Sequence, residues 1–131
     1  MKKRLLIFCL FVSAFTFPVT CDADANSRLT ERQALDVLVS RIKMDKLYDS
    51  RAPNLSCLLF LTEEKAKNYF DFAIREKHGD GCPGDPDTAP IVDRFRVNRV
   101  TRSIQWYDPI EGEFRPYKTM LKLRQEQSDS R

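Results

Sequence analysis

The sequence predicts a small α+β domain: one N-terminal helix packed on an antiparallel meander of three to five strands, with one disulfide. One apolar stripe has helical spacing, between residues 30 and 43. Short apolar or alternating runs follow it, separated by turns that contain Gly, Pro, Asp or Asn. Because a helix stripe needs an apolar surface to cover it, one face of the sheet is expected to bury it.

The first 25 residues are typical of a signal peptide. Basic residues at positions 2–4 precede an apolar run at 5–17, which is too short to span a bilayer. Ala23 and Ala25 supply the small residues that signal peptidase requires, so a mature chain beginning near Asn26 is expected. This pattern predicts a periplasmic or secreted protein.

Cys21 leaves an alternative open. The leader of a lipoprotein is cut directly before a cysteine that then carries the lipid, although the residues ahead of Cys21 match such sites poorly. The alternative location is therefore that of an envelope lipoprotein. No other apolar stretch is long enough to cross a membrane, so membrane contact is expected only through the signal peptide or this anchor.

Beyond the leader, the length suits one domain at 26–123, followed by a polar tail at 124–131 that is expected to be disordered. Cys57 and Cys82 remain, and in an oxidising compartment they are expected to form a disulfide. A redox-active pair would have the closer CxxC spacing. The net charge of +3 and the scattered basic residues do not suggest nucleic-acid binding.

The helix is predicted to begin at Thr30, where Gln33 can complete a capping box and Leu29 can pack as a hydrophobic staple. Its apolar stripe consists of Leu35, Leu38, Val39 and Ile42. The helix should end near residue 43, and a loop with Pro53 should follow at 49–54.

The first strand is predicted in the continuous apolar run at 56–61. Residues 63–78 fit either a helix or a strand. Their aromatic and β-branched residues favour a strand at about 69–77.

The alternating runs at 91–99 and 103–107 predict a hairpin that Pro109 ends. On these strands Phe95 and Trp106 are expected in the core. A short edge strand is expected at 114–117, where Phe114 and Tyr117 either cover an edge or meet a partner.

The second half of the mature chain carries a GDPxTAP loop at 84–90, a DRFRV strand at 93–97 and a WYDP strand end at 106–109. In these motifs it resembles a group of small exported bacterial proteins that are mostly uncharacterised. The order of a helix followed by a meander also resembles PepSY-like and cystatin-like domains. That resemblance implies a binding or inhibitory module and assigns no binding residue.

The segment HGDGCPGDPDTAP, at 78–90, gathers residue types found in active sites, including His78, the only histidine. The spacing of Asp80, Asp85 and Asp87 does not follow a calcium loop, and the prolines stiffen the path. Asp, Gly and Pro are also the residues of tight turns, so we expect a rigid connection. No metal, cofactor or catalytic residue is predicted.

The sheet face away from the helix is expected to be rich in Arg and Tyr, residue types that are enriched where proteins bind one another. The candidate binding residues are Arg75, Arg94, Arg96, Gln105 and Tyr107, beside Tyr69 and Asp71. The competing interpretation is a solvated face on which Arg and Asp pair across strands.

We expect an exported protein-binding module without enzymatic activity, such as an inhibitor or immunity-type protein acting on an envelope hydrolase or a toxin. The alternative is a structural or lipid-anchored envelope protein without an inhibitory role.

Overall fold

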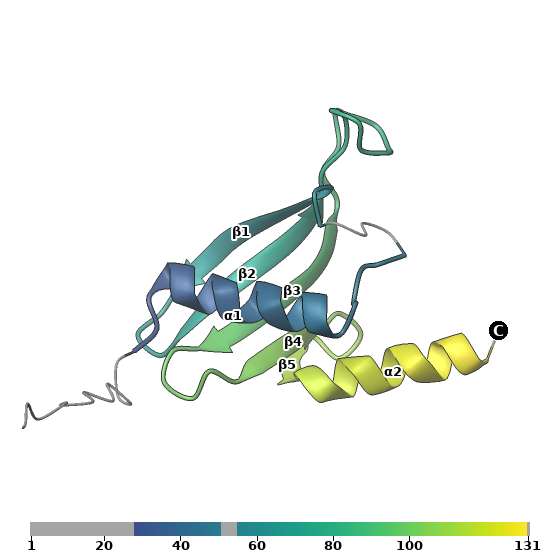
Figure 1. Ribbon diagram of the computed structural model, residues 1–131. Helices are drawn as coiled ribbons and strands as arrows, with labels where there is room; N and C mark the ends of the chain where they lie inside the picture. Colours follow the sequence, from purple (N-terminus) through teal and green to yellow (C-terminus); the bar gives the residue numbers. More distant parts are fainter. Residues whose placement is uncertain (1–27, 51–54, 131) are drawn as a thin grey trace, which may run out of the picture.

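A computed structural model describes residues 28–50 and 55–130. The predicted signal peptide, its cleavage site and Cys21 lie outside these residues, as do residues 51–54 of the predicted loop. The elements in order are α1 (Glu31–Met44), β1 (Leu58–Lys65), β2 (Tyr69–Glu76), β3 (Ile91–Asn98), β4 (Ile104–Asp108), β5 (Glu113–Pro116) and α2 (Tyr117–Asp129). Figure 1 shows α1 crossing the sheet and α2 beside it. The predicted α+β fold is confirmed.

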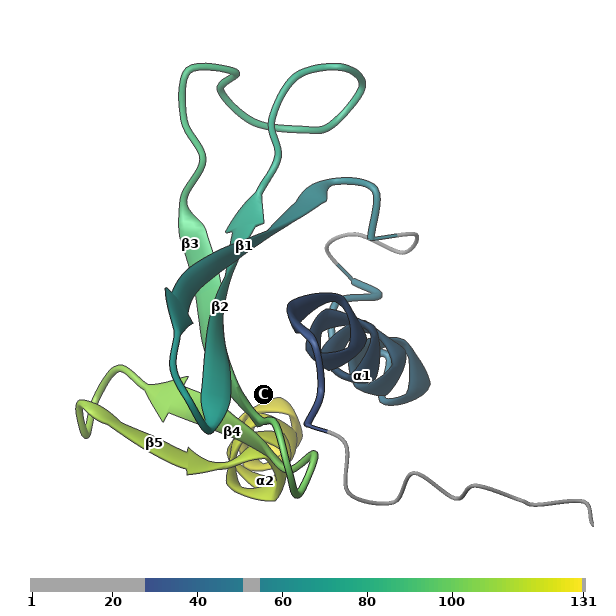
Figure 2. The ribbon, with the colours of Figure 1, turned by 90° about the vertical axis from the view of Figure 1, so that its left-hand side faces the viewer.

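The five strands form one antiparallel sheet in the order β1-β2-β3-β4-β5, which is the predicted meander. Helix α1 packs over β2 and β3, and α2 packs against β4 and β5. The ring of Tyr117 in α2 lies 5.9 Å from that of Phe95, which also faces α1. Both helices therefore cover one face of the sheet, which we call the inner face (Figure 2).

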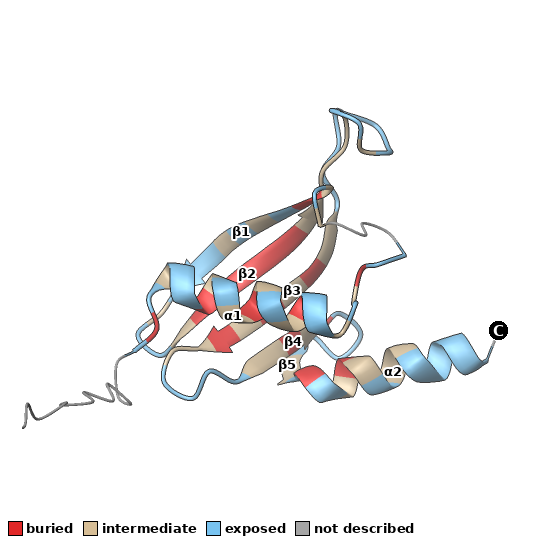
Figure 3. Ribbon diagram, viewed as in Figure 1, coloured by how far each residue is buried: buried red, intermediate tan, exposed pale blue. Residues whose placement is uncertain are grey.

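The start of α1 follows the predicted capping box. Thr30 Oγ1 accepts a hydrogen bond from the Gln33 backbone N–H, and the Gln33 side chain accepts one from the Thr30 N–H. The helix then buries Ala34, Leu38 and Ile42. Figure 3 shows the buried residues concentrated on β2 and β3, beneath α1.

Strand β2 resolves the ambiguous segment at 63–78 as sheet. Alternate residues of β2 face α1: Phe70, Phe72 and Ile74 are all buried in the core. The predicted disulfide between Cys57 and Cys82 is present, with a Cα–Cα distance of 5.5 Å. It joins the residue before β1 to the loop that leaves β2.

Helix α2 corrects the prediction of a disordered tail at 124–131, because the helix continues to Asp129. The predicted edge strand ends at Pro116, and Tyr117 begins the helix. Only two residues of α2 are buried, Tyr117 and Met120, and its N-terminus has no side-chain cap. The helix is therefore stabilised mainly by tertiary contacts, for which the local sequence gives little signal.

Candidate functional site

The sheet face opposite the helices, which we call the open face, is covered by no helix of the described residues (Figure 2). The strand register brings three of the predicted side chains together on it: Asp71 pairs with Arg96, and Arg96 pairs with Gln105. Tyr107 pairs with Phe114 on the neighbouring strand.

Arg96 lies at the centre of the open face and is held on three sides. Its Nε and Nη2 each donate a hydrogen bond of 2.8 Å to the Asp71 carboxylate. Its guanidinium lies 3.6 Å from the ring centroid of Tyr69 and 4.1 Å from that of Phe114. We call these four residues the Arg96 clamp. The two hydrogen bonds to the Asp71 carboxylate raise the pKa of Arg96 above its usual value.

One ring contact and one hydrogen bond extend the clamp. The rings of Tyr107 and Phe114 meet edge to face at 5.4 Å, beside Gln105. The hydroxyl of Tyr69 donates a hydrogen bond of 3.0 Å to Glu64, which raises the pKa of Tyr69. The centre of the open face is thus a set of side chains with fixed orientations.

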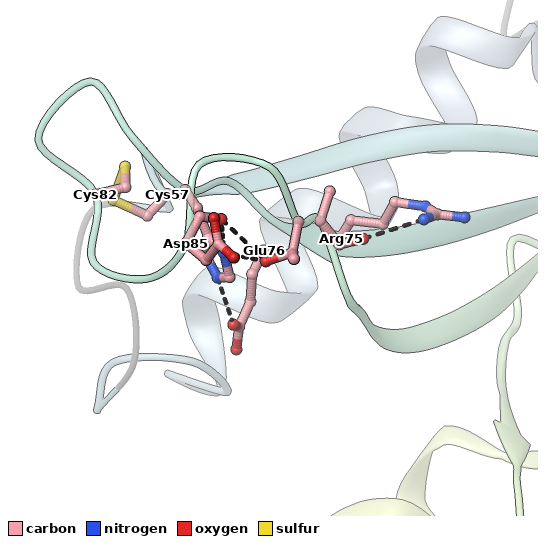
Figure 4. A network of polar contacts seen from close by, with 8 residues as sticks. Cys57, Arg75, Glu76, Cys82 and Asp85 are labelled. Atoms are coloured by element: carbon pink, nitrogen blue, oxygen red, sulfur yellow. Dashed lines mark hydrogen bonds and ion pairs between the residues drawn. A yellow bond between two sulfur atoms is a disulfide. The ribbon is translucent and has the colours of Figure 1, made fainter.

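The other predicted binding arginines also have partners within the chain. Arg94 Nε lies 2.8 Å from Glu63 Oε2, and Arg75 Nη1 donates to the carbonyl of Ala89. Figure 4 draws this hydrogen bond of Arg75 as a dashed line. Both side chains are half-buried, so part of each remains exposed to a partner. Contacts within the chain and a binding role are therefore compatible on this face.

Sequence reasoning missed two leucines on the open face. A continuous apolar run such as that at 56–61 is typical of a buried strand, but β1 is an edge strand, and Leu59 and Leu61 are 37% and 46% exposed. Leu58 and Phe60 alternate with them and pack into the core. The apolar run gave no signal that one face of the strand is open.

The loop at 78–90 connects β2 to β3 and is held by several contacts. The disulfide anchors it to the start of β1, and Gly79 and Cys82 form an isolated bridge within it. Figure 4 shows the disulfide within this loop and Asp85 close to the end of β2. A Cβ added at Gly84 would lie 2.6 Å from the ring of His78, so the loop backbone lies directly against that ring.

Both ring nitrogens of His78 bind groups of the same region. Nε2 lies 3.0 Å from Glu76 Oε2, and Nδ1 lies 2.9 Å from the Asp85 carbonyl and from Thr88 Oγ1. The Glu76 carboxylate, and then the Asp85 carbonyl, raise the pKa of His78. This geometry assigns His78 to holding the loop in place.

A buried carboxylate joins the sheet to the segment after α1 and to α2. Asp93 accepts hydrogen bonds from the Tyr48 hydroxyl at 2.5 Å, from Trp106 Nε1 at 2.8 Å and from Arg124 Nη2 at 2.7 Å. Burial and the adjacent Asp93 carboxylate raise the pKa of Tyr48. Every one of these contacts is satisfied within the protein, which fits a structural role.

Among the cavities of the described part of the chain, two lie on the helix side. One of about 680 Å³ runs between α1, β4 and α2 and is lined mainly by apolar groups, including Val37, Met44 and Ile104. The other, of about 530 Å³, lies between α2 and the turn after β4. Neither contains His78 or a residue of the Arg96 clamp.

Within residues 28–50 and 55–130, no three His, Cys, Asp or Glu side chains come together in a way that could hold a metal ion. No helix in the described part of the chain is long and apolar enough to cross a membrane. In the comparisons with known proteins, no family model, no curated protein and no solved structure matches the chain.

Proposed function

We propose that this chain is a small exported module, without catalytic activity, that binds another protein through the open face of its sheet. The Arg96 clamp is the observation that carries the proposal. It places an arginine and two aromatic rings in fixed positions on a face that no described helix covers. Aromatic residues and arginine contribute most of the binding energy at many protein interfaces.

The rigidity of the clamp favours binding. Association costs free energy whenever mobile side chains become fixed, and side chains that are already fixed avoid much of that cost. A partner surface with an apolar centre and carbonyl or carboxylate groups around it would complement this face.

The residues most often used for catalysis are occupied by structural contacts, which supports a binding role. Both nitrogens of His78 have partners, and Cys57 and Cys82 are joined to each other. We propose inhibition or neutralisation of an envelope hydrolase or a toxin as the use of the module.

The test begins by capturing a partner from an envelope extract on the immobilised mature chain and purifying that partner. Arg75→Glu combined with Arg94→Glu should then weaken its binding at least tenfold in calorimetry, because both charges lie on the open face. Arg32→Glu is the matched control, since Arg32 is exposed on α1. Equal affinity of the open-face variant and the wild type would remove this face from the proposal.

The second candidate is the structural or lipid-anchored envelope protein, and Cys21 is the residue that favours it. The intact mass of the exported chain separates the two. A chain that begins at Asn26 excludes the anchor, whereas acylated Cys21 establishes it.

A further inference from the structure

Strand β1 combines an open edge with exposed apolar side chains. It is the first strand of the sheet, and no described strand pairs with its other side. Leu59 and Leu61 are two of the five large apolar residues that the described part of the chain exposes. An exposed apolar edge strand is a template for pairing with another strand, which proteins normally avoid.

The backbone of β1 shows which groups face outward. The Cys57 carbonyl accepts a hydrogen bond of 2.8 Å from the Lys77 N–H, so Cys57 bonds to the strand next to it. In antiparallel pairing, such residues alternate with residues whose backbone groups point away. Phe60 and Thr62 therefore direct their N–H and C=O groups to the open edge, where no described residue binds them.

The sequence of β1 is complementary to itself in one antiparallel register. When Phe60 lies opposite Phe60 of a second copy, Leu58 lies opposite Thr62 and Leu59 opposite Leu61. The outward backbone groups then meet one another. Two hydrogen bonds form between the two Phe60 residues, and one more forms at each end of the contact. The Leu58 N–H cannot add a further hydrogen bond between the copies, because it already donates to the Leu55 carbonyl.

The same register buries the exposed leucines. Leu59 and Leu61 occupy the closely spaced, non-hydrogen-bonded positions, where the Cα atoms of opposite residues are about 4.5 Å apart. Each leucine on the open face would therefore contact the other leucine of the second copy. A shift by two residues in one direction would place Leu59 opposite Glu63, next to a charged group. A shift in the other direction would pair Leu59 with Leu59 but leave Leu61 opposite Cys57, which lies outside β1.

The pairing would stop at two copies. A bulge between Thr62 and Glu64 interrupts β1, and charged residues follow it. The opposite edge, β5, has only four residues and includes Pro116, which cannot donate a ladder hydrogen bond. A two-fold contact through β1 alone closes on itself and does not propagate.

We propose that two copies of this chain form a symmetric dimer by antiparallel pairing of β1 with β1, centred on Phe60. The two sheets become continuous, and the two open faces lie side by side. This inference does not depend on what the open face binds.

The first test measures mass. The full-length gene is expressed, the exported oxidised chain is purified, and sedimentation is followed across the micromolar range. The wild type should sediment as a dimer, and Leu59→Lys with Leu61→Lys should sediment as a monomer, because four lysines would meet at the contact. Met44→Lys is the matched control, since Met44 is 71% exposed on α1, and it should leave the dimer intact.

The second test fixes the register. Leu59→Cys and Leu61→Cys are made as separate chains and oxidised as a mixture. A disulfide between the two kinds of chain should dominate, because these positions lie opposite each other, whereas identical positions are offset along the strands. A wild-type monomer throughout the range, a dimer that survives both lysines, or disulfides mainly between identical positions would each overturn the proposal.

Discussion

Replacing Cys82 by Ser should lower the free energy of unfolding by about 3.5 kcal/mol under oxidising conditions. The disulfide joins residues 25 positions apart. In the chain-entropy model, closing a loop of that length removes about 12 cal/mol/K from the unfolded chain, which is ~3.5 kcal/mol at 25 °C. Small domains are stable by only about 5–15 kcal/mol, so the loss is a large share.

Urea unfolding followed by the fluorescence of Trp106 measures this loss, because Trp106 is the only tryptophan and lies in the core. The double variant Cys57→Ser with Cys82→Ser is the control for the free thiol that the single variant leaves. It should unfold at the same urea concentration as the single variant. In hydrogen-exchange measurements, the largest increase in amide exchange rate should occur in the loop at 78–90. A loss below about 1 kcal/mol would refute the assignment of this bond as the main anchor of the loop.

Further substitutions test the other contacts. Asp93→Ala should destabilise the fold by about 2–5 kcal/mol in urea unfolding, because it leaves two buried donors, Tyr48 and Trp106, and the half-buried Arg124 without their acceptor; a loss below about 1 kcal/mol would contradict this role. Gly84→Ala should destabilise more than Gly81→Ala, since both have positive φ but only the first adds a Cβ against the His78 ring; equal losses would show that the ring contact costs nothing. His78→Gln should cost more stability at acid than at alkaline pH: the raised pKa of His78 stabilises the fold below about pH 6.5, and this contribution is lost as the pH rises through the folded pKa. A difference between wild type and His78→Gln that grows with pH would reverse that sign.

The features that could be predicted are those that depend on neighbours in the sequence. The capping box of α1 needs only Thr30 and Gln33, three residues apart. The alternation in β3 assigned Phe95 to the core and Arg96 to the other face without knowledge of the partner strands. The disulfide followed from a count of cysteines.

Helix α2 could not be predicted because its main contacts are distant in sequence. Tyr117 packs on Phe95, and Arg124 pairs with Asp93. Without these contacts the segment is a polar stretch that follows a proline. A weak apolar pattern of this kind gives no reason to prefer a helix to a tail.

At the candidate site, composition predicted the residue types but not their geometry. The register of three strand pairs determines the surroundings of Arg96. It places Arg96 beside Asp71 and between Tyr69 and Phe114. The exposure of Leu61 depends on β1 being at the edge, which is a property of the whole sheet.

The most direct test of the open face is a hydrogen-exchange footprint of the chain bound to its purified partner. The proposal predicts that protection on binding is concentrated on β2, β3 and β4, around Asp71, Arg96 and Gln105, with little change in α1. Protection confined to α1 and α2, with unchanged exchange in these strands, would contradict it.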